Sequence, residues 1–353
     1  MQRTINMLSR ATSVKGQGVG SAYEEQVSLV QNNLKDMYKV EINQVKFADI
    51  RHYHTINLEF FLTIPFTKIK SSTVGYVHFL PETLESSIKL PRFAKKVFYK
   101  YVISFYKSMD YLITVNPYFI DKLVAYGINR EKITYIPNYV SSKRFYKIDK
   151  KSKNSIRKKY HVDSKKFVVL CVGQLQTRKG VADFIEVAKM LPDIEFVWAG
   201  GFSFKKISDG YSQIKKLTEN PPSNVKFLGI VPREEMNEVY NMADIMFLPS
   251  YEELFPMTVL ESANCKLPIL LRDIELYKGI LEGYYLKGKN NLEFKNEIEK
   301  LSQDQIYYNK ASQMAHECSK YYSEENVAKM WRAYYNKIYK RGLKKTWRKR
   351  NEN

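Results

Sequence analysis

Two glutamates separated by seven residues, Glu253 and Glu261, fall in the segment Pro249–Glu261. The apolar run Ile245–Leu248 before them predicts a strand, and the apolar residues from Met257 onward predict a helix that carries Glu261. In an open α/β sheet, ligands bind where the strands end. Carboxylates there would accept hydrogen bonds from sugar or ribose hydroxyls, and the helix N-terminus would favour a phosphate. The alternative is that both glutamates are ordinary solvated acids.

A pair of cations, Arg178 and Lys179, lies in the segment Val172–Gly180, directly after the apolar run Phe167–Val172. A predicted strand therefore ends just before a turn with two positive charges. Cations in this place suit a diphosphate, because they stabilise negative charge that develops on a departing phosphate. A solvated turn is the alternative interpretation.

Candidate ligand-binding residues also occur in the N-terminal half. The glycines of the segment Gly16–Gly20 precede a predicted helix at Ala22–Leu34, and glycine lets the backbone approach a phosphate closely. A plain flexible turn is equally compatible with them. His78 follows a predicted strand, and His54 and Asn57 follow another candidate strand. The alternative for His78 is a core histidine that is satisfied by the backbone.

Short apolar runs alternate with helical patterns along the chain, which predicts parallel sheets covered by helices on both faces. The expected strands are Lys39–Val45, Thr73–Val77, Tyr111–Val115, Ile133–Pro137, Phe167–Val172, Ile194–Ala199, Val225–Leu228, Ile245–Leu248 and Pro268–Leu271. The expected helices include Ala22–Leu34, Gly180–Met190 and Arg233–Asn241.

The Lys- and Ser-rich stretch Ser141–Lys166 breaks this alternation, and we interpret it as an interdomain connection with a short helix around Ser152–Tyr160. We therefore expect an N-terminal domain at residues 1–150 and a C-terminal domain at residues 151–326. A basic helical tail is expected at residues 327–353.

The formal net charge is +20, from 57 Lys and Arg against 37 Asp and Glu. An excess of this size suits an anionic membrane, a nucleic acid or a phosphorylated substrate. The three scattered cysteines indicate free thiols in a reducing compartment. The polar N-terminus is not a secretory signal, and no run of 18 apolar residues occurs, so we expect a cytoplasmic protein that at most binds a membrane face.

Two basic stretches are interleaved with aromatic residues. The first contains Arg92, Lys95, Lys96 and Lys100 with no acid between them, and the second is the tail, with Trp331, Tyr334 and Tyr335 among its lysines and arginines. Such helices can lie on an anionic membrane, where each cation contributes about 1 kcal/mol. The alternative for either stretch is a solvated helix that covers a core.

These segments together resemble the retaining glycosyltransferases of the GT-B fold, often called family 4. The mark of that family is the glutamate pair with seven residues between, which Glu253 and Glu261 match. Further resemblances are Val172–Gly180 to the first strand and turn of the donor domain, Val225–Ile230 to the base-binding strand, Ala243–Ile245 to the entry of the glutamate motif, and Ile133–Val140 to the end of the N-terminal domain. The resemblance implies two Rossmann-like domains that face each other across a cleft.

The resemblance also implies a role for each matched residue. Glu261 would bind the ribose, Glu253 would lie beside the transferred sugar, and Lys179 with Arg178 would neutralise the diphosphate. The remaining implied roles are sugar and phosphate binding by the amides of Met257, Thr258 and Val259, donor binding by Gln174 and Ile230, approach to the donor across the cleft by Gly18 and Gly20, approach to the transferred sugar by His78, and lining of the acceptor side by His54 and Asn57. His78, Glu253 and Lys179 are the expected catalytic residues.

The sequence departs from the family pattern in two places. Gln174 stands where family members often have an arginine, so one diphosphate cation is missing or is replaced by Arg178. Leu254 and Pro256 stand where two glycines often follow the first glutamate, which makes this loop stiffer.

The resemblance implies a hexosyltransferase that retains anomeric configuration by same-face attack, with no metal and no other cofactor. The segments Gly173–Gly180 and Pro249–Glu261 are similar to those of bacterial transferases that form glycosyl-diacylglycerols. We therefore expect transfer from UDP-glucose or UDP-galactose to a membrane lipid, such as diacylglycerol or a glycosyl-diacylglycerol, by a protein bound peripherally to the inner face of the cell membrane.

Two alternatives stay open at this point. The first is a transferase for capsule, exopolysaccharide or another cell-envelope polymer. The second is a non-enzymatic polyanion-binding protein, although no nucleic-acid partner is expected because the sequence carries no recognisable nucleic-acid-binding motif.

Overall fold

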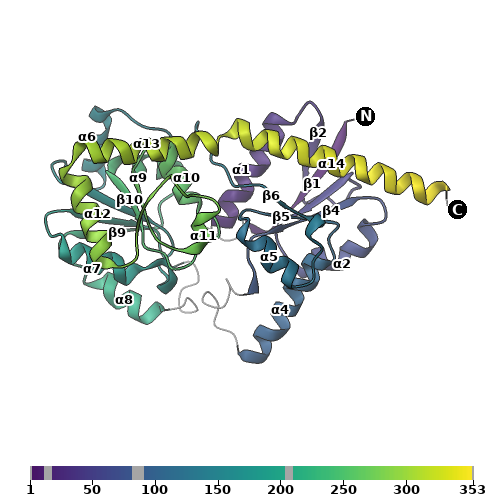
Figure 1. The fold of residues 1–353 in the computed structure, drawn as a ribbon, viewed down its shortest axis with the longest axis horizontal. Helices are drawn as coiled ribbons and strands as arrows, with labels where there is room; N and C mark the ends of the chain where they lie inside the picture. Colours follow the sequence, from purple (N-terminus) through teal and green to yellow (C-terminus); the bar gives the residue numbers. More distant parts are fainter. Residues whose placement is uncertain (1, 12–17, 82–90, 203–209, 352–353) are drawn as a thin grey trace. The chain divides into compact units, whose positions relative to one another are not determined.

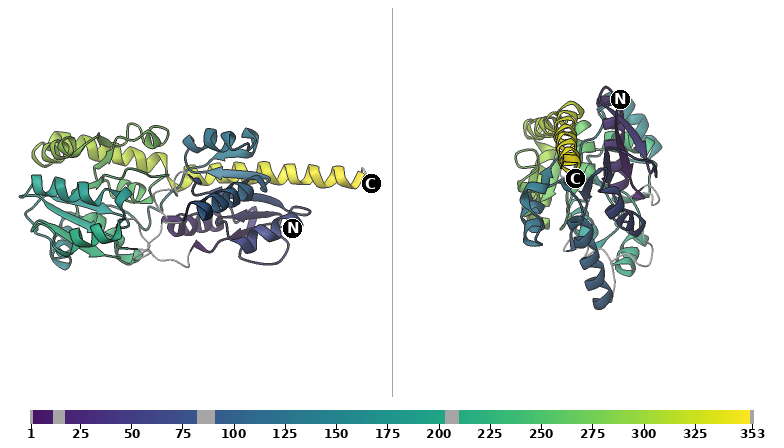
Figure 2. Two further views of the ribbon diagram at one scale, coloured as in Figure 1. Left: turned by 90° about the horizontal axis from the view of Figure 1, so that it is seen from below. Right: turned by 90° about the vertical axis from the view of Figure 1, so that its right-hand side faces the viewer.

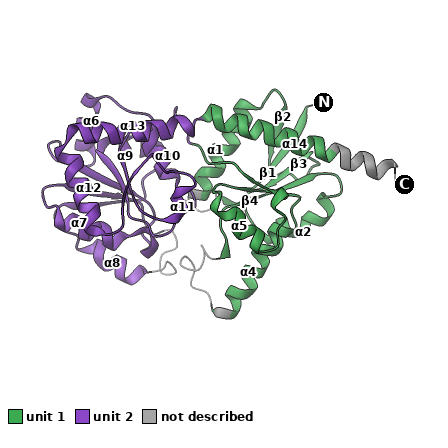
Figure 3. Cartoon of the chain, viewed as in Figure 1, with its two compact units in different colours: residues 1–82, 90–139, 324–353 green, residues 83–89, 140–323 purple. Residues whose placement is uncertain are grey.

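The computed structural model describes residues 2–11, 18–81, 91–202 and 210–351. They form two compact units, which Figure 3 shows in different colours. Unit 1 contains the described residues within 1–82, 90–139 and 324–353, and unit 2 contains those within 140–323.

Unit 1 is built on a six-stranded parallel sheet with the strand order β2-β1-β3-β4-β5-β6. Its strands are β1 (Arg3–Leu8), β2 (Tyr38–Ile42), β3 (Ile50–Tyr53), β4 (Ser72–Val77), β5 (Tyr111–Thr114) and β6 (Ile133–Tyr135). The chain places β2 on one side of β1 and β3 on the other. The direction of strand addition therefore reverses between β1 and β3, which is where ligands bind in open α/β sheets.

The helices of unit 1 pack around this sheet (Figure 1). They are α1 (Gly18–Asn33), α2 (Leu58–Thr67), α4 (Arg92–Lys107), α5 (Tyr118–Ala125) and α14 (Glu324–Asn351), with the short 3₁₀ turn η2 (Arg130–Lys132). The C-terminal helix α14 contacts α1 and β4, and Figure 2 shows it extending along this unit. The first unit is thus completed by the last helix of the chain.

Unit 2 contains a second six-stranded parallel sheet with the order β12-β11-β10-β7-β8-β9. Its strands are β7 (Val168–Val172), β8 (Glu195–Ala199), β9 (Val225–Gly229), β10 (Ile245–Leu248), β11 (Ile269–Arg272) and β12 (Leu286–Gly288). The chain adds β8 and β9 on one side of β7 and then crosses to add β10 on the other side. The reversal point of this sheet therefore lies between β7 and β10.

Helices cover the sheet of unit 2, and aromatic side chains fill its core. The ring of Phe184 lies 5.2 Å from that of Trp198, and Phe247 lies 4.9 Å from Phe294. The helices and 3₁₀ turns are α6 (Lys150–Lys159), η3 (Thr177–Lys179), α7 (Val181–Met190), α8 (Tyr211–Glu219), η5 (Arg233–Glu235), α9 (Met236–Met242), α10 (Met257–Asn264), α11 (Glu275–Lys278), α12 (Asn291–Gln303) and α13 (Gln305–Tyr321).

The predicted parallel sheets covered by helices are confirmed in both units. The expected strand Lys39–Val45 ends at Ile42, because Asn43 adopts a left-handed conformation with φ of 51°. Strands β1 and β12 were not expected. Cys171, Cys265 and Cys318 are free and buried.

The two units divide after residues 139 and 323, whereas the expected breaks lay after residues 150 and 326. Within the stretch expected to connect the domains, the amides of Tyr146 and Ile148 donate to Asn237 and Asn241 of α9. Arg157 of α6 forms an ion pair of 2.6 Å with Asp244. These contacts make the expected connection part of unit 2, which begins at residue 140.

The aromatic residues of the C-terminal helix belong to a protein core. Trp331, Tyr334 and Tyr335 are at most 5% exposed, and Arg332 forms an ion pair with Asp36 at 2.6 Å. The expectation that these rings meet a membrane is wrong, because α14 uses them to pack on α1 and β4. None of the described helices is both long and apolar enough to cross a bilayer.

Candidate active site

The turn after β7 and the loop after β10 lie at the reversal point of the second sheet. Because β7 and β10 are parallel neighbours, their carboxyl ends meet at one edge. The turn carries Arg178 and Lys179, and the loop Pro249–Glu253 carries the first of the two glutamates. The sheet topology therefore brings together residues that lie about seventy positions apart.

Hydrogen bonds to backbone carbonyls hold the turn and the loop against each other. The amide of Tyr251 donates to the carbonyl of Arg178 at 2.8 Å, and the Arg178 guanidinium donates to the carbonyl of Glu252 at 3.1 Å. Gly180 ends the turn with φ of 72°, and a Cβ there would lie 2.5 Å from the carbonyl oxygen of Pro249. Only glycine allows this approach without strain.

Lys179 and Glu253 form a buried ion pair between Nζ and Oε1, with their side chains 13% and 8% exposed. Burial alone would raise the pKa of Glu253, but Lys179 and Arg178 outweigh it and lower that pKa below its ordinary value. Burial lowers the pKa of Lys179, and the Glu253 carboxylate opposes that shift. The pair therefore holds an anion and a cation together where ligands enter such a sheet.

Arg272, at the end of β11, anchors the loop after β10, and the sequence analysis missed it. Its Nε donates to the carbonyl of Pro249 at 2.9 Å, and its guanidinium lies 3.8 Å from the ring centre of Tyr251. It also forms an ion pair of 3.1 Å with Asp183 of α7. The signal available in the sequence was a lone arginine at the end of an apolar strand, where an arginine is buried only if it is paired.

Glu261, in α10, belongs to a second buried network. It is 3% exposed, accepts a hydrogen bond of 2.5 Å from the hydroxyl of Tyr240, and forms an ion pair of 2.9 Å with Arg233. The hydrogen bonds recorded for Glu261 thus tie it to the segment after β9, whereas Glu253 is tied to the turn after β7. Sequence reasoning missed both partners. A carboxylate has about four acceptor positions, so these two bonds leave capacity for a ligand hydroxyl.

Helix α10 begins at Met257, as predicted. Its N-cap is Pro256, and no side chain caps its first amides. The amide of Val259 bonds to the carbonyl of Pro256 at 3.1 Å, whereas the first amides of any helix lack partners inside the helix. The amides of Met257 and Thr258 are therefore better placed than that of Val259 to bind an anion.

Glycines form part of the same sheet edge. A Cβ on Gly200, after β8, would lie 1.9 Å from the carbonyl oxygen of Gly173, which follows β7 and precedes Gln174. A Cβ on Gly201 would lie 2.9 Å from the side chain of Ile230, which is 54% exposed. These close approaches leave an edge without bulky side chains, next to an exposed apolar residue.

In unit 1, His54 lies at the reversal point between β1 and β3. Its amide donates to the carbonyl of Leu8 at 2.8 Å, and its ring lies 4.9 Å from that of Tyr23. His78 follows β4 and stacks on Tyr76 with ring centres 4.3 Å apart. Burial lowers the pKa of His78 to about 3, so its imidazole is neutral at physiological pH. A neutral ring can donate or accept a hydrogen bond but supplies no positive charge.

The other predicted residues of unit 1 lie at helix ends and on α4. Gly18 begins α1, and a Cβ on Gly20 would lie 3.2 Å from the carbonyl oxygen of Ala11. Asn57 is the residue before α2. Lys96 and Lys100 of α4 are exposed and Lys95 is partly exposed, whereas the side chain of Arg92 and the segment Thr12–Gln17 lie outside the described residues. The binding of one donor molecule by these residues together with those of unit 2 stays a prediction.

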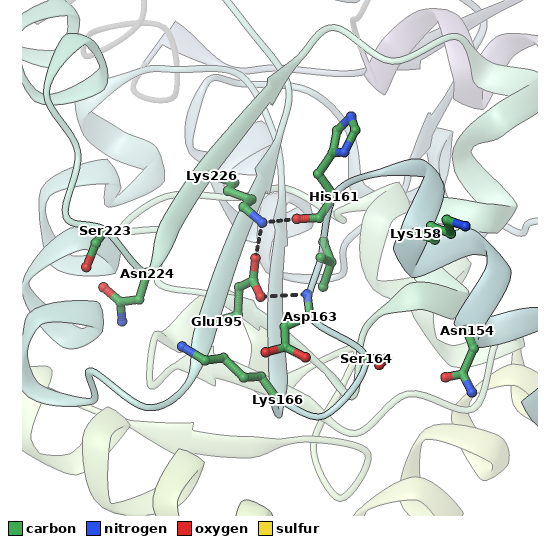
Figure 4. Close-up of a pocket in the computed structure, with 11 residues that line it drawn as sticks. Asn154, Lys158, His161, Asp163, Ser164, Lys166, Glu195, Ser223, Asn224 and Lys226 are labelled. Carbon is green, nitrogen blue, oxygen red and sulfur yellow. Dashed lines mark hydrogen bonds and ion pairs between the residues drawn. The ribbon is translucent and has the colours of Figure 1, made fainter.

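A pocket of about 650 Å³ lies at the opposite edge of the second sheet (Figure 4). Its lining includes Lys166, just before β7, Glu195 at the start of β8, and Lys226, whose Nζ lies 2.5 Å from Glu195. These residues lie at the amino ends of the strands, away from the predicted site. Among the described residues, no three His, Cys, Asp or Glu side chains are placed to hold a metal ion.

Comparisons with known proteins show the family of the chain. A family model described as glycosyl transferases group 1 matches residues 152–321. The chain is 45% identical over 333 residues to the alpha-galactosylglucosyldiacylglycerol synthase of Streptococcus pneumoniae, covering 94% of this chain and 89% of that protein. It is 31% identical over 239 residues to the processive diacylglycerol alpha-glucosyltransferase of Acholeplasma laidlawii, covering 67% and 71% of the two chains.

The fold is shared with more distant proteins. The crystal structure of Anabaena Alr3699/HepE in complex with UDP-glucose matches with a TM-score of 0.76 at 14% identity, over 95% of this chain and 99% of that one. The matched strands and helices are those of a GT-B glycosyltransferase, as the sequence predicted. On the family model and on the two relatives above, the chain belongs to the group 1 glycosyltransferases.

Proposed function

We propose that this enzyme transfers a hexose from a UDP-sugar to a glycosyl-diacylglycerol in a membrane, with galactose as the favoured sugar and a glucosyl lipid as the favoured acceptor. The relative at 45% identity is named for the product galactosylglucosyldiacylglycerol, and the second relative is named for glucosyl transfer to diacylglycerol. Both names favour a lipid product over a cell-envelope polymer. Both also specify an alpha product, which means retention of configuration when the donor is an alpha-linked UDP-hexose.

The observation that carries the proposal is the buried Lys179–Glu253 pair at the reversal point of the second sheet. The ammonium group of Lys179 would contact the donor diphosphate, with Arg178 beside it. The first amides of α10 would donate further hydrogen bonds to the diphosphate. Preorganised positive charge of this kind stabilises the departing UDP as negative charge builds on it. We propose that this stabilisation takes the place of a metal ion.

The other predicted residues would hold the rest of the donor and the acceptor. Glu261 has acceptor capacity left for ribose hydroxyls, and the exposed Ile230 offers an apolar surface to a base. Neutral His78 would hydrogen-bond the transferred sugar, and His54 and Asn57 would lie on the acceptor side. The departing phosphate would help to deprotonate the acceptor hydroxyl on the same face of the sugar.

We further propose that the enzyme acts as a peripheral protein on the inner face of the cell membrane. The exposed Lys96 and Lys100 of α4, with Lys95, would contact anionic headgroups, each contributing about 1 kcal/mol. The net charge of +20 acts in the same direction.

The test is a donor and acceptor screen with purified protein. Vesicles that contain diacylglycerol or glucosyl-diacylglycerol are mixed with UDP-glucose or UDP-galactose, and the lipid product is identified by mass. We expect one added galactose on glucosyl-diacylglycerol, and at least tenfold less product from Lys179→Met than from a control, Lys158→Met. Lys158 belongs to α6 and lines the pocket of Figure 4, at the opposite edge of the sheet. Absence of lipid product with every pair would refute the proposed function.

A further inference from the structure

Helix α2 presents a row of large apolar side chains to solvent. Leu58, Leu62 and Phe66 are 61%, 63% and 76% exposed, and their spacing of four residues places them along one helix face. Ile69, just beyond the helix, is 63% exposed. A contiguous exposed apolar surface of this kind marks an interaction site rather than ordinary surface variation.

The opposite face of α2 is apolar as well. Phe60 and Ile64 are buried in unit 1, so the helix is hydrophobic on both sides. A surface helix of a water-soluble domain normally has a polar outer face. The outer face of α2 therefore needs an apolar environment of its own, separate from the core that its inner face contacts.

Helix α4 lies beside α2 and carries an exposed apolar row of its own. The ring of Phe61 lies 5.5 Å from that of Tyr101, whose hydroxyl donates to the carbonyl of Ile56. Along α4 from Tyr101, Val97 and Phe93 follow at intervals of four residues and are 53% and 80% exposed. Figure 3 shows both helices in unit 1.

Positive charge borders this apolar surface. The sequence of α4 contains no acid, and its exposed Lys96 and Lys100 lie next to the row of Phe93 and Val97. The single acid of α2, Glu59, is neutralised by an ion pair of 2.7 Å with Arg10. An apolar row edged by lysines fits the boundary between anionic headgroups and acyl chains.

The same charges argue against a second copy of the chain as the occupant. In a symmetric dimer each residue of the patch meets the equivalent patch on the partner, so the two α4 helices would place lysines near lysines. Anionic lipids satisfy the lysines and the apolar row together.

We propose that α2 is an insertion anchor whose row Leu58, Leu62 and Phe66 enters the headgroup–acyl boundary, with α4 as its cationic border. The inference rests on the proposed lipid acceptor. Because α2 begins directly after Asn57, the Leu58 end of the row adjoins the carboxyl edge of β3, where His54 lies. A lipid beside α2 would thus present its headgroup to the predicted acceptor side.

The first test compares two double variants by sedimentation with vesicles of phosphatidylcholine and phosphatidylglycerol. Leu62→Ser with Phe66→Ser removes two of the three apolar side chains of the row, and Leu292→Ser with Ile306→Ser removes side chains that are 62% and 83% exposed on unit 2. High salt screens the lysines but not apolar insertion. We expect the first variant to lose binding at high salt at least tenfold and the control to bind as the wild type does. Equal binding by both variants would overturn the proposal.

The second test locates the row by fluorescence. Tryptophan in Phe66→Trp should be quenched by brominated phosphatidylcholine in the vesicles, and tryptophan in Ile306→Trp should not. Equal quenching in the two variants, or a wild-type dimer that the serine substitutions dissociate, would refute insertion.

A soluble acceptor separates this inference from the proposed function. With a short-chain glucosyl-diacylglycerol below its aggregation threshold, the serine variant of α2 should turn over at the wild-type rate. If neither protein glycosylates that acceptor or any vesicle lipid, the proposed function fails whatever the binding results. Normal turnover with unchanged vesicle binding overturns the anchor alone.

Discussion

Replacement of Lys179 by methionine tests the site because it removes one charge and keeps the aliphatic stem. The partner carboxylate of Glu253 is 8% exposed and would stay behind as an unpaired buried charge. Removing one member of a buried pair destabilises by about 3–5 kcal/mol, which corresponds to a fall of roughly 10 °C in the melting temperature of a domain of this size. Adding Glu253→Gln removes the stranded charge, so the double variant should recover most of that loss.

Activity should respond differently from stability. If Lys179 stabilises the departing diphosphate, both Lys179→Met and the double variant should lose about 10²-fold in kcat or more, because the stabilising cation is absent in each. Thermal unfolding and initial rates with UDP-galactose measure the two effects on the same samples. A double variant no more stable than Lys179→Met, or wild-type kcat in either variant, would refute the role assigned to Lys179.

The same pair makes a prediction about pH. Because the pKa of Glu253 is lowered in the folded protein, its contribution is present above its unfolded pKa and is lost as the pH falls through the folded value. Acid should therefore destabilise the wild type more than Glu253→Gln, as measured by thermal unfolding at decreasing pH. An identical pH dependence of the two proteins would show that Lys179 does not hold the carboxylate in its charged form.

Three further predictions concern single positions. Gly180→Ala should destabilise the fold by about 1–3 kcal/mol because the backbone there is left-handed, and further because the added Cβ would meet Pro249. Gly283→Ala, with φ of 86° and open space around it, should show the backbone effect alone. Thermal unfolding compares the two variants. His52 lies in β3 and is fully buried, and burial lowers its pKa to about 3, so the folded protein resists its protonation. Between pH 6.5 and pH 5, the free energy of urea unfolding should therefore fall by about 2 kcal/mol more in the wild type than in His52→Gln, and equal losses would show that His52 stays accessible to protons. Trp331→Ala should cost about 3–5 kcal/mol because that ring is 1% exposed, whereas Met330→Ala, at 40% exposure, should cost about 0.5 kcal/mol or less by the same measurement; a small loss in both would mean that α14 is not part of the core.

The alternation of apolar runs with helical patterns was enough to predict two parallel sheets, because buried parallel strands are continuous apolar runs. Strand β1 was not predicted because Arg3–Leu8 mixes polar and apolar residues. Asn6 is buried in this strand through its hydrogen bonds to the backbone of Gln44. The basic C-terminal helix was predicted and is confirmed as α14, but the environment of its aromatic rings was not, because its composition fits either a membrane or a core. Its packing on unit 1 depends on contacts some three hundred residues away in sequence.

In the candidate site, the sequence identified the residues that end strands but not the residues that hold them. Lys179 and Glu253 follow apolar strands and match a spacing pattern, so both could be named in advance. Arg272, Arg233 and Tyr240 act through long-range pairing, which no local spacing reveals. Arg272 could be found only from the strand order β11-β10, which places the end of β11 beside the loop after β10. Arg233 and Tyr240 could be found only from their bonds to Glu261 in the folded unit.

A crystal structure of the enzyme with bound UDP-galactose would locate the donor. We expect the diphosphate to lie against Lys179 and the first amides of α10, with the ribose within hydrogen-bonding distance of Glu261. A nucleotide bound instead in the pocket lined by Lys166 and Lys226, at the opposite edge of the sheet, would contradict this expectation.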